Sequence, residues 1–162
     1  MLDVYGHVKL IDFGLCRQLE AEVEPMSPIG SLIYMAPEML IDHSAGRQTD
    51  WWAVGILAHE LLTGRTPWSS LSNKKVIRKE IKHTVVCPPV QLCPAAGSFI
   101  VRLLQKDPTR RLGTIADIDV TAAPFFASID WEATRRGESE PVSSVRTGSR
   151  QAVTLSLGQA SK

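Results

Sequence analysis

Asp12 is the residue whose type and position most directly suggest chemistry. It follows an apolar alternation in residues 7–11 and precedes Phe13 and Gly14, which places its carboxylate on a loop at the end of an expected strand. Carboxylate oxygens are the hard ligands that Mg²⁺ binds in proteins. Alone, the triplet is equally compatible with a turn that holds no metal, because Asp and Gly are common turn residues.

The elements that must position Asp12 are a strand pair and a loop. Residues 2–11 predict a hairpin, with turn chemistry at residues 3–6 and a half-buried strand at residues 7–11. Residues 16–30 are polar and contain two prolines, Pro25 and Pro28, which predicts an irregular loop.

Helices are expected to follow this loop. Thr49 is a good helix N-cap with Asp50 in the first turn, residues 51–62 are apolar nearly all round, and Gly64 provides a stop. Such a helix belongs inside a larger body rather than on its surface.

Two more helices are expected further along the chain. Residues 74–81 are amphipathic, with lysines opposite Ile77 and Ile81, and Pro94 can start a helix that runs toward Asp107. The expected body is therefore mainly α-helical, with a short N-terminal β-hairpin.

Composition restricts the class of protein. The chain has 162 residues, 44% of them hydrophobic and 22% charged, and a formal net charge of +1, which gives no electrostatic reason to expect nucleic acid or membrane partners. The three cysteines have no metal-ligand spacing and fit reduced thiols in the cytosol or nucleus. Residues 137–162 are rich in polar residues, and we expect a disordered tail.

Roughly residues 2–131 resemble the C-terminal lobe of a serine/threonine protein kinase of the AGC class, and look closest to ribosomal S6 kinases. The residues that carry the resemblance are Gly6–Leu15, Tyr34–Glu38, Asp50–Trp52, Asp107–Gly113, Pro124–Phe126 and Ile129–Trp131. The resemblance implies a protein kinase-like fold, α+β overall. Within that fold, residues 1–136 are expected to form a partial kinase domain from the strand pair onward.

The resemblance also implies a nucleotide site. Asp12 is expected to hold the Mg²⁺ that accompanies ATP, with Phe13 packing to set the loop and Gly14 permitting the turn. Ile11, just before this motif, is expected to line the floor of the adenine pocket; it is also an ordinary strand residue, and the two interpretations do not conflict.

The activation segment is expected to follow. Ser27 matches the phosphorylation site of the family and Arg17 a basic position that helps to hold the phosphate. Because Pro28 and Ile29 depart from the usual family residues, the upstream activating kinase is open, and an unmodified loop serine remains an alternative. Ser31 matches a hydroxyl that contacts the catalytic aspartate and the peptide substrate.

Three charged residues match structural positions of the family. Glu38 and Arg111 are expected to form a buried ion pair that ties the activation segment to the helical body. Asp50 matches a buried acid that anchors the backbone of the catalytic loop, and it also suits a helix N-terminus.

The implied activity is that of a transferase that moves the γ-phosphate of ATP to serine or threonine of protein substrates. This chain shows no glycine-rich loop, no lysine strand with its partner glutamate, and no His-Arg-Asp loop to supply the catalytic base. We therefore expect the chain alone to be inactive, as a truncated product, a short isoform or an incomplete gene model. The alternative is a non-catalytic, pseudokinase-like binding or scaffold module.

Overall fold

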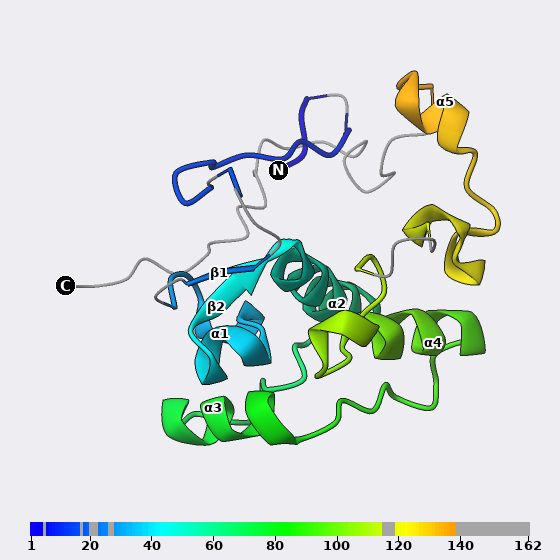
Figure 1. Cartoon of the computed structure of the whole chain (residues 1–162). Helices are drawn as coiled ribbons and strands as arrows, with labels where there is room; N and C mark the ends of the chain where they lie inside the picture. The colour runs from blue at the N-terminus through cyan, green and yellow to red at the C-terminus, as the bar shows by residue number, and fades with distance from the viewer. Residues whose placement is uncertain (5, 17, 20–22, 26–27, 115–118, 139–162) are drawn as a thin grey trace. The chain divides into compact units, whose positions relative to one another are not determined.

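The computed structural model describes residues 1–4, 6–16, 18–19, 23–25, 28–114 and 119–138 (Figure 1). The chain divides into two compact units: residues 1–17 with 128–162, and residues 18–127. The tail expected at residues 137–162 lies outside the described residues from position 139 onward. In the part that is described, no helix combines the length and apolar character needed to cross a bilayer.

The first unit contains the expected hairpin in reduced form. Leu2 and Val8 pair in a single antiparallel bridge, and the Asp3 amide donates to the His7 carbonyl at 2.9 Å. The half-buried strand at residues 7–11 was a wrong prediction, because Val8 is 76% and Leu10 83% exposed. A two-stranded pair has no second layer to bury its side chains against, and it is marginally stable by itself.

The unit also contains helix α5 (Trp131–Arg135). The Asp130 carboxylate caps it by accepting a hydrogen bond from the Ala133 amide at 2.9 Å, as an N-cap acid does.

The second unit begins with a small sheet. Strand β1 (Val23–Pro25) pairs antiparallel with β2 (Ser44–Gly46), and Glu24 lies opposite Ala45. The irregular loop predicted for residues 16–30 is therefore wrong at β1. A strand of this length shows too little alternation to be recognised, and Pro25 is tolerated because it closes the strand in a two-stranded sheet.

The helices of this unit follow β1 (Figure 1). They are α1 (Pro37–Ile41), α2 (Arg47–Thr63), α3 (Lys74–His83) and α4 (Pro94–Leu103). Single 3₁₀ turns, labelled η, occur at Leu32–Tyr34, Pro108–Arg110, Val120–Ala122 and Pro124–Phe126 (η1–η4).

Helix α2 begins at Arg47, upstream of the predicted N-cap Thr49. Within the helix, the Thr49 hydroxyl donates to the Gly46 carbonyl at 2.6 Å, so it binds back to the preceding turn instead of capping. The predicted stop is present: Gly64 has a φ of 74° and closes the helix in the left-handed conformation.

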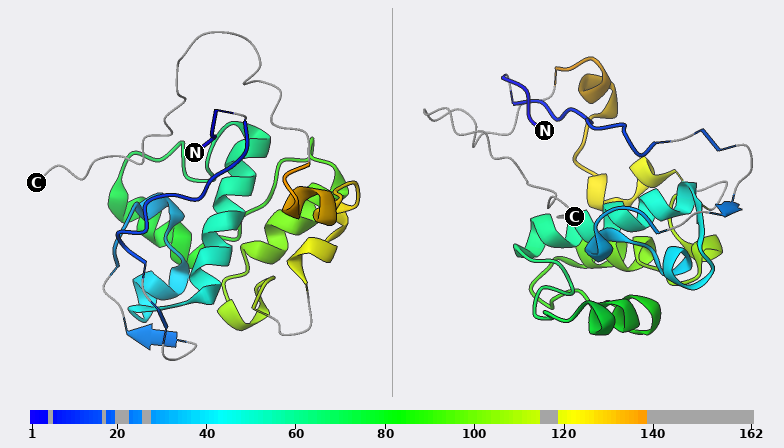
Figure 2. Two further views of the ribbon diagram at one scale, coloured as in Figure 1. Left: turned by 90° about the horizontal axis from the view of Figure 1, so that it is seen from above. Right: turned by 90° about the vertical axis from the view of Figure 1, so that its left-hand side faces the viewer.

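The core forms where α4 packs against α2 (Figure 2). Trp52, Ile56 and Ile100 are fully buried, and Ile77 and Ile81 of α3 join the same cluster. The two helices approach closely at Gly55, where an added Cβ would lie 2.7 Å from a Leu104 methyl group. These helices provide the rigid frame on which the candidate residues of the second unit are held.

Candidate functional site

Asp12 stands on a turn in a left-handed backbone conformation, with a φ of 63°. Its Oδ1 accepts from the Gly14 amide at 3.4 Å, and the side chain is exposed. The left-handed residue is therefore Asp12 itself, whereas Gly14, expected to permit the turn, has no positive φ. Asp is one of the few residue types other than glycine that visit this conformation routinely.

The neighbours of Asp12 are exposed as well. Phe13, expected to pack and set the loop, is 62% exposed, and Ile11, expected beneath an adenine ring, is 50% exposed. Arg17 and Ser27, the predicted phosphate-binding and phosphorylation residues, lie outside the described residues. The turn therefore presents its carboxylate to solvent with apolar side chains on either side.

Ser31 lies immediately before η1 in the second unit. Its carbonyl accepts from the Tyr34 amide at 3.0 Å, and its hydroxyl makes no capping hydrogen bond to this turn. The side chain is exposed. The contact expected between this hydroxyl and a protein substrate stays a prediction.

Glu38 and Arg111 are brought together from distant parts of the sequence. Arg111 Nη1 lies 2.7 Å from Glu38 Oε1 and Nη2 lies 3.0 Å from Oε2, which makes a bidentate pair. The side chain of Arg111 is 0% exposed and that of Glu38 is 4% exposed. Nε and Nη2 also donate to the Gln105 carbonyl, and Nη1 donates to the Gln48 carbonyl. The guanidinium therefore uses all five of its N–H groups.

This ion pair connects several elements of the helical unit. Glu38 comes from α1, Gln48 from the first turn of α2, and Gln105 and Arg111 from the segment after α4. The guanidinium carbon also lies 5.2 Å from the centre of the Trp52 ring, within cation–π range. The pair therefore fixes the start of α1 against the core of the unit.

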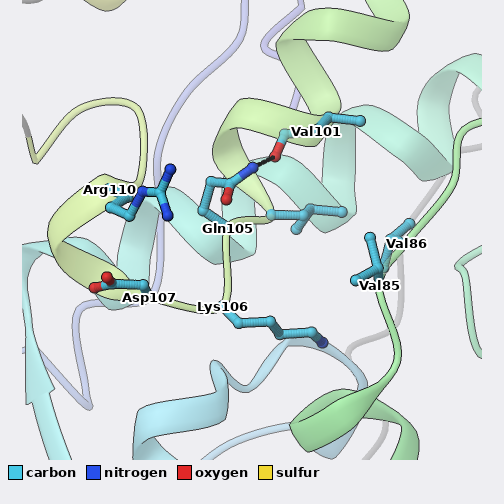
Figure 3. Close-up of a pocket in the computed structure, with 8 residues that line it drawn as sticks. Val85, Val86, Val101, Gln105, Lys106, Asp107 and Arg110 are labelled. Carbon is cyan, nitrogen blue, oxygen red and sulfur yellow. Dashed lines mark hydrogen bonds between the residues drawn. The ribbon is translucent and has the colours of Figure 1, made fainter.

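Lys106 is a second cation in this core. Its Nζ donates to the Ile81 carbonyl at 2.5 Å and lies 4.8 Å from the centre of the Trp52 ring and 5.7 Å from that of Trp68. Burial, reinforced by the charge of Arg111, lowers the pKa of Lys106 to about 8. Figure 3 shows its side chain extending from the segment that carries Arg110 toward the side of a pocket lined by Val85 and Val86.

That pocket has a volume of about 240 Å³, and a second pocket of about 560 Å³ is lined in part by Trp68, Leu71 and Glu80. Neither pocket is lined by Asp12 or Ser31. Both pockets are lined by residues of the second unit.

Asp50 differs from its expected environment. It lies in the first turn of α2, as predicted, but it is exposed rather than buried. Partial desolvation still raises its pKa above the ordinary value. Val54, Leu57 and Leu61 follow Asp50 on the same helix face, and they are 38%, 40% and 72% exposed. The expectation that α2 is enclosed on all sides was wrong for this face, because none of the packing that buries Trp52 and Ile56 reaches it.

Tyr34 and Glu60 form a contact that sequence reasoning missed. The Tyr34 hydroxyl donates to Glu60 Oε2 at 2.6 Å, joining η1 to α2. Burial raises the pKa of Tyr34 to about 12, and the hydrogen bond and charge of Glu60 act in the same direction. The two residues are far apart in the chain, and neither lies in a pattern that would signal the other.

The donor set of Asp12 is compatible with Mg²⁺. This ion keeps several waters and takes one or two carboxylates together with phosphate oxygens, so it does not need an all-protein cage. Across the described residues, no group of three or more His, Cys, Asp or Glu could hold a metal by itself. A single solvent-facing carboxylate therefore fits an ion that would be shared with phosphate oxygens and water better than a structural metal.

Comparison with curated proteins finds serine/threonine kinases. The chain is 39% identical to akt-1 of Caenorhabditis elegans over 144 residues, covering 87% of this chain and 26% of that protein. It is 38% identical to RAC-beta serine/threonine-protein kinase B of Xenopus laevis over 145 residues, 87% of this chain and 30% of that protein. It is 37% identical to ribosomal protein S6 kinase beta of C. elegans over 134 residues, 81% of this chain and 24% of that protein.

The chain thus spans about a quarter to a third of the length of these relatives. A family model described as the protein kinase domain matches residues 1–126. That range includes the Asp12 turn, Ser31, and both partners of the Glu38–Arg111 pair. On this evidence the chain belongs to the protein kinase family.

Proposed function

We propose that this chain is part of an ATP-dependent serine/threonine protein kinase, namely the C-terminal lobe of an AGC-class enzyme that resembles ribosomal S6 kinases. The observation that carries the proposal is the exposed Asp12 carboxylate on its left-handed turn, inside the segment matched by the kinase family. The Akt and S6 kinase names among the relatives support the class. The S6-like subclass depends on the motif residues alone.

Each site residue has a proposed task in the complete kinase. Asp12 would hold the Mg²⁺ that accompanies ATP, and the ion would neutralise negative charge on the phosphates. Ile11 would contact the adenine ring, and the exposed hydroxyl of Ser31 would meet the protein substrate. Ser27, if phosphorylated by an upstream kinase, would pair with Arg17. The Glu38–Arg111 pair would hold the start of α1 against the helical core of the second unit.

We further propose that residues 1–136 are one part of the kinase domain and do not transfer phosphate alone. The supporting observation is the exposed stripe of Val54, Leu57 and Leu61 beside Asp50. Contiguous apolar surface of this kind is typically covered in a stable protein. We propose that a further part of the kinase domain covers this apolar surface. The free, exposed thiols of Cys16, Cys87 and Cys93 support a reducing compartment such as the cytosol or nucleus.

The test is phosphotransfer by the natural gene product, captured with an antibody against residues 138–162 and assayed with ATP, Mg²⁺ and serine- or threonine-containing peptides. We expect Asp12→Asn to reduce the rate by a factor of about 10² or more, because the metal loses its protein carboxylate. Asp42→Asn is the matched control, since Asp42 is also an exposed acid. It should leave the rate unchanged.

Equal activity of the wild-type protein and the Asp12→Asn variant would refute the metal-binding role. Phosphotransfer that is absent from the natural product in every preparation would instead favour the non-catalytic binding module.

A further inference from the structure

Helix α3 carries an unusual concentration of positive charge. Five of its 10 residues are lysine or arginine, although the whole chain has a net charge of only +1. Lys74, Lys75, Arg78 and Lys79 are exposed, and Lys82 is partly exposed. Figures 1 and 2 show α3 at the edge of the second unit, with the other helices to one side of it.

No described residue neutralises these charges. The ion pairs formed by the described residues involve Lys9, Arg111, Arg135 and Arg136, and no cation of α3. The one acid of α3, Glu80, is partly buried; it lines the 560 Å³ pocket and its charge acts on Lys106. Within the part of the chain that the structure describes, the outer face of the helix is therefore basic and has no ion-pair partner.

The concentration of positive charge destabilises α3 as a helix. Lys74–Arg78, Lys75–Lys79 and Arg78–Lys82 are like-charge pairs one turn apart, and such pairs destabilise a helix. Lys74 and Lys75 also occupy the first turn, which contains no acid, where the helix dipole disfavours cations. The fold holds α3 by other means: the Asn73 side chain accepts from the Lys75 amide at 2.8 Å, and Ile77 and Ile81 are buried.

We propose that the outer face of α3 is a docking surface for an acidic segment of a partner protein. The carboxylates of such a segment would relieve the repulsion among the α3 cations, for which the described residues supply no ion-pair partner. The proposal does not depend on Asp12 or on phosphoryl transfer.

A short acidic peptide fits better than nucleic acid or membrane. The basic face spans one 10-residue helix, about 15 Å long, whereas the chain as a whole has a pI of about 7.8, below the range typical of nucleic-acid-binding domains. An interfacial helix would turn its apolar face to lipid. The apolar face of α3 is instead buried in the core through Ile77 and Ile81.

The test uses the full chain and a short fluorescein-labelled peptide of alternating Glu and Ser, with binding followed by fluorescence anisotropy. The variant is Arg78→Glu with Lys79→Glu. The control, Arg135→Glu with Arg136→Glu, changes the net charge equally but at the C-terminal end of α5. We expect the α3 variant to weaken binding about tenfold or more, the control less than about twofold, and salt to weaken wild-type binding.

Stability supplies an independent readout. The α3 substitutions convert the like-charge pairs into opposite-charge pairs, so the variant should melt roughly 2–4 °C higher than the wild-type chain while it loses the peptide. Loss of binding with a lower melting temperature would overturn the proposal, because the repulsion that motivates it would be absent.

Three other outcomes would also overturn it: no binding of the peptide, equal weakening by the control variant, or an undiminished affinity of the α3 variant. Tighter binding of a single-stranded oligonucleotide, or of vesicles containing phosphatidylserine, than of the peptide at the same salt concentration would assign the surface to a different class of partner.

Discussion

Replacing Glu38 by Gln is expected to remove a large part of the stability of the second unit. The substitution keeps the shape of the side chain but leaves the Arg111 guanidinium, which is 0% exposed, without its counter-charge. Three hydrogen bonds to the backbone carbonyls of Gln48 and Gln105 would remain. They satisfy N–H groups but do not neutralise the charge.

The expected loss in the free energy of unfolding follows from the burial of the ion pair. Breaking a buried ion pair from one side costs about 3–5 kcal/mol, whereas an exposed pair contributes about 1 kcal/mol or less. At 0% and 4% exposure, Glu38–Arg111 belongs to the first class. The total stability of a domain is about 5–15 kcal/mol, so Glu38→Gln should shift the unfolding midpoint strongly.

The assay is urea unfolding followed by tryptophan fluorescence, for the wild-type chain, Glu38→Gln, Arg111→Met and the double variant. Arg111→Met leaves the carboxylate buried and unpaired, so it should cost a similar amount. The double variant should lose about 2 kcal/mol less than the sum of the single variants, because neither charge is then left alone. A Glu38→Gln cost below about 1 kcal/mol, or additivity within about 0.5 kcal/mol, would refute this reasoning.

Three further predictions concern close packing and titration. Gly113→Ala should destabilise by about 2–5 kcal/mol, because its φ is 91° and an added Cβ would lie 2.4 Å from the Trp51 ring. Gly64→Ala, with a φ of 74° and no atom within 4 Å, should cost only about 1 kcal/mol in the same urea titration, and equal costs would contradict the packing argument. Gly55→Ala should destabilise by about 1–3 kcal/mol, because the added Cβ would clash with Leu103 and Leu104. Gly97→Ala in α4 has open space around the added Cβ and should stabilise by about 0.5–1 kcal/mol. A higher melting temperature for Gly55→Ala than for Gly97→Ala would be inconsistent with the α2–α4 contact. In a Tyr5→Phe chain Tyr34 is the one remaining tyrosine, and its phenolate absorbance should titrate near pH 12 rather than 10.0. Since the fold favours the neutral phenol, the free energy of unfolding should fall as pH rises from about 10 to 12. A titration midpoint of Tyr34 at the ordinary value of 10.0 would show that Glu60 does not hold this hydroxyl.

Local patterns predicted the parts of the fold that local forces determine. The lysines opposite Ile77 and Ile81 identified α3, Pro94 marked the start of α4, and Gly64 marked the end of α2. In each case the signal and its cause lie within one or two turns of chain. The predicted start of α2 was wrong because Arg47 and Gln48 carry no apolar signal and because β2 leads directly into the helix.

Features that depend on tertiary contacts were harder to predict. The Glu38–Arg111 pairing was expected from the family resemblance, since no periodicity connects residues so far apart, and the structure contains it. No sequence motif predicted the hydrogen bond between Tyr34 and Glu60. Gly14 was expected to permit the turn, but the positive φ belongs to Asp12, because turn composition alone does not say which position takes the strained conformation.

The central proposal is that a longer kinase carries this sequence and transfers phosphate to protein. The most direct measurement is the intact mass of the natural gene product, captured through residues 138–162, with phosphotransfer to serine or threonine assayed on the same sample. We expect a species well above 17.8 kDa whose activity requires Asp12. A product found only at 17.8 kDa and without phosphotransfer would contradict the proposal that this chain is part of an active kinase and would favour the non-catalytic binding module.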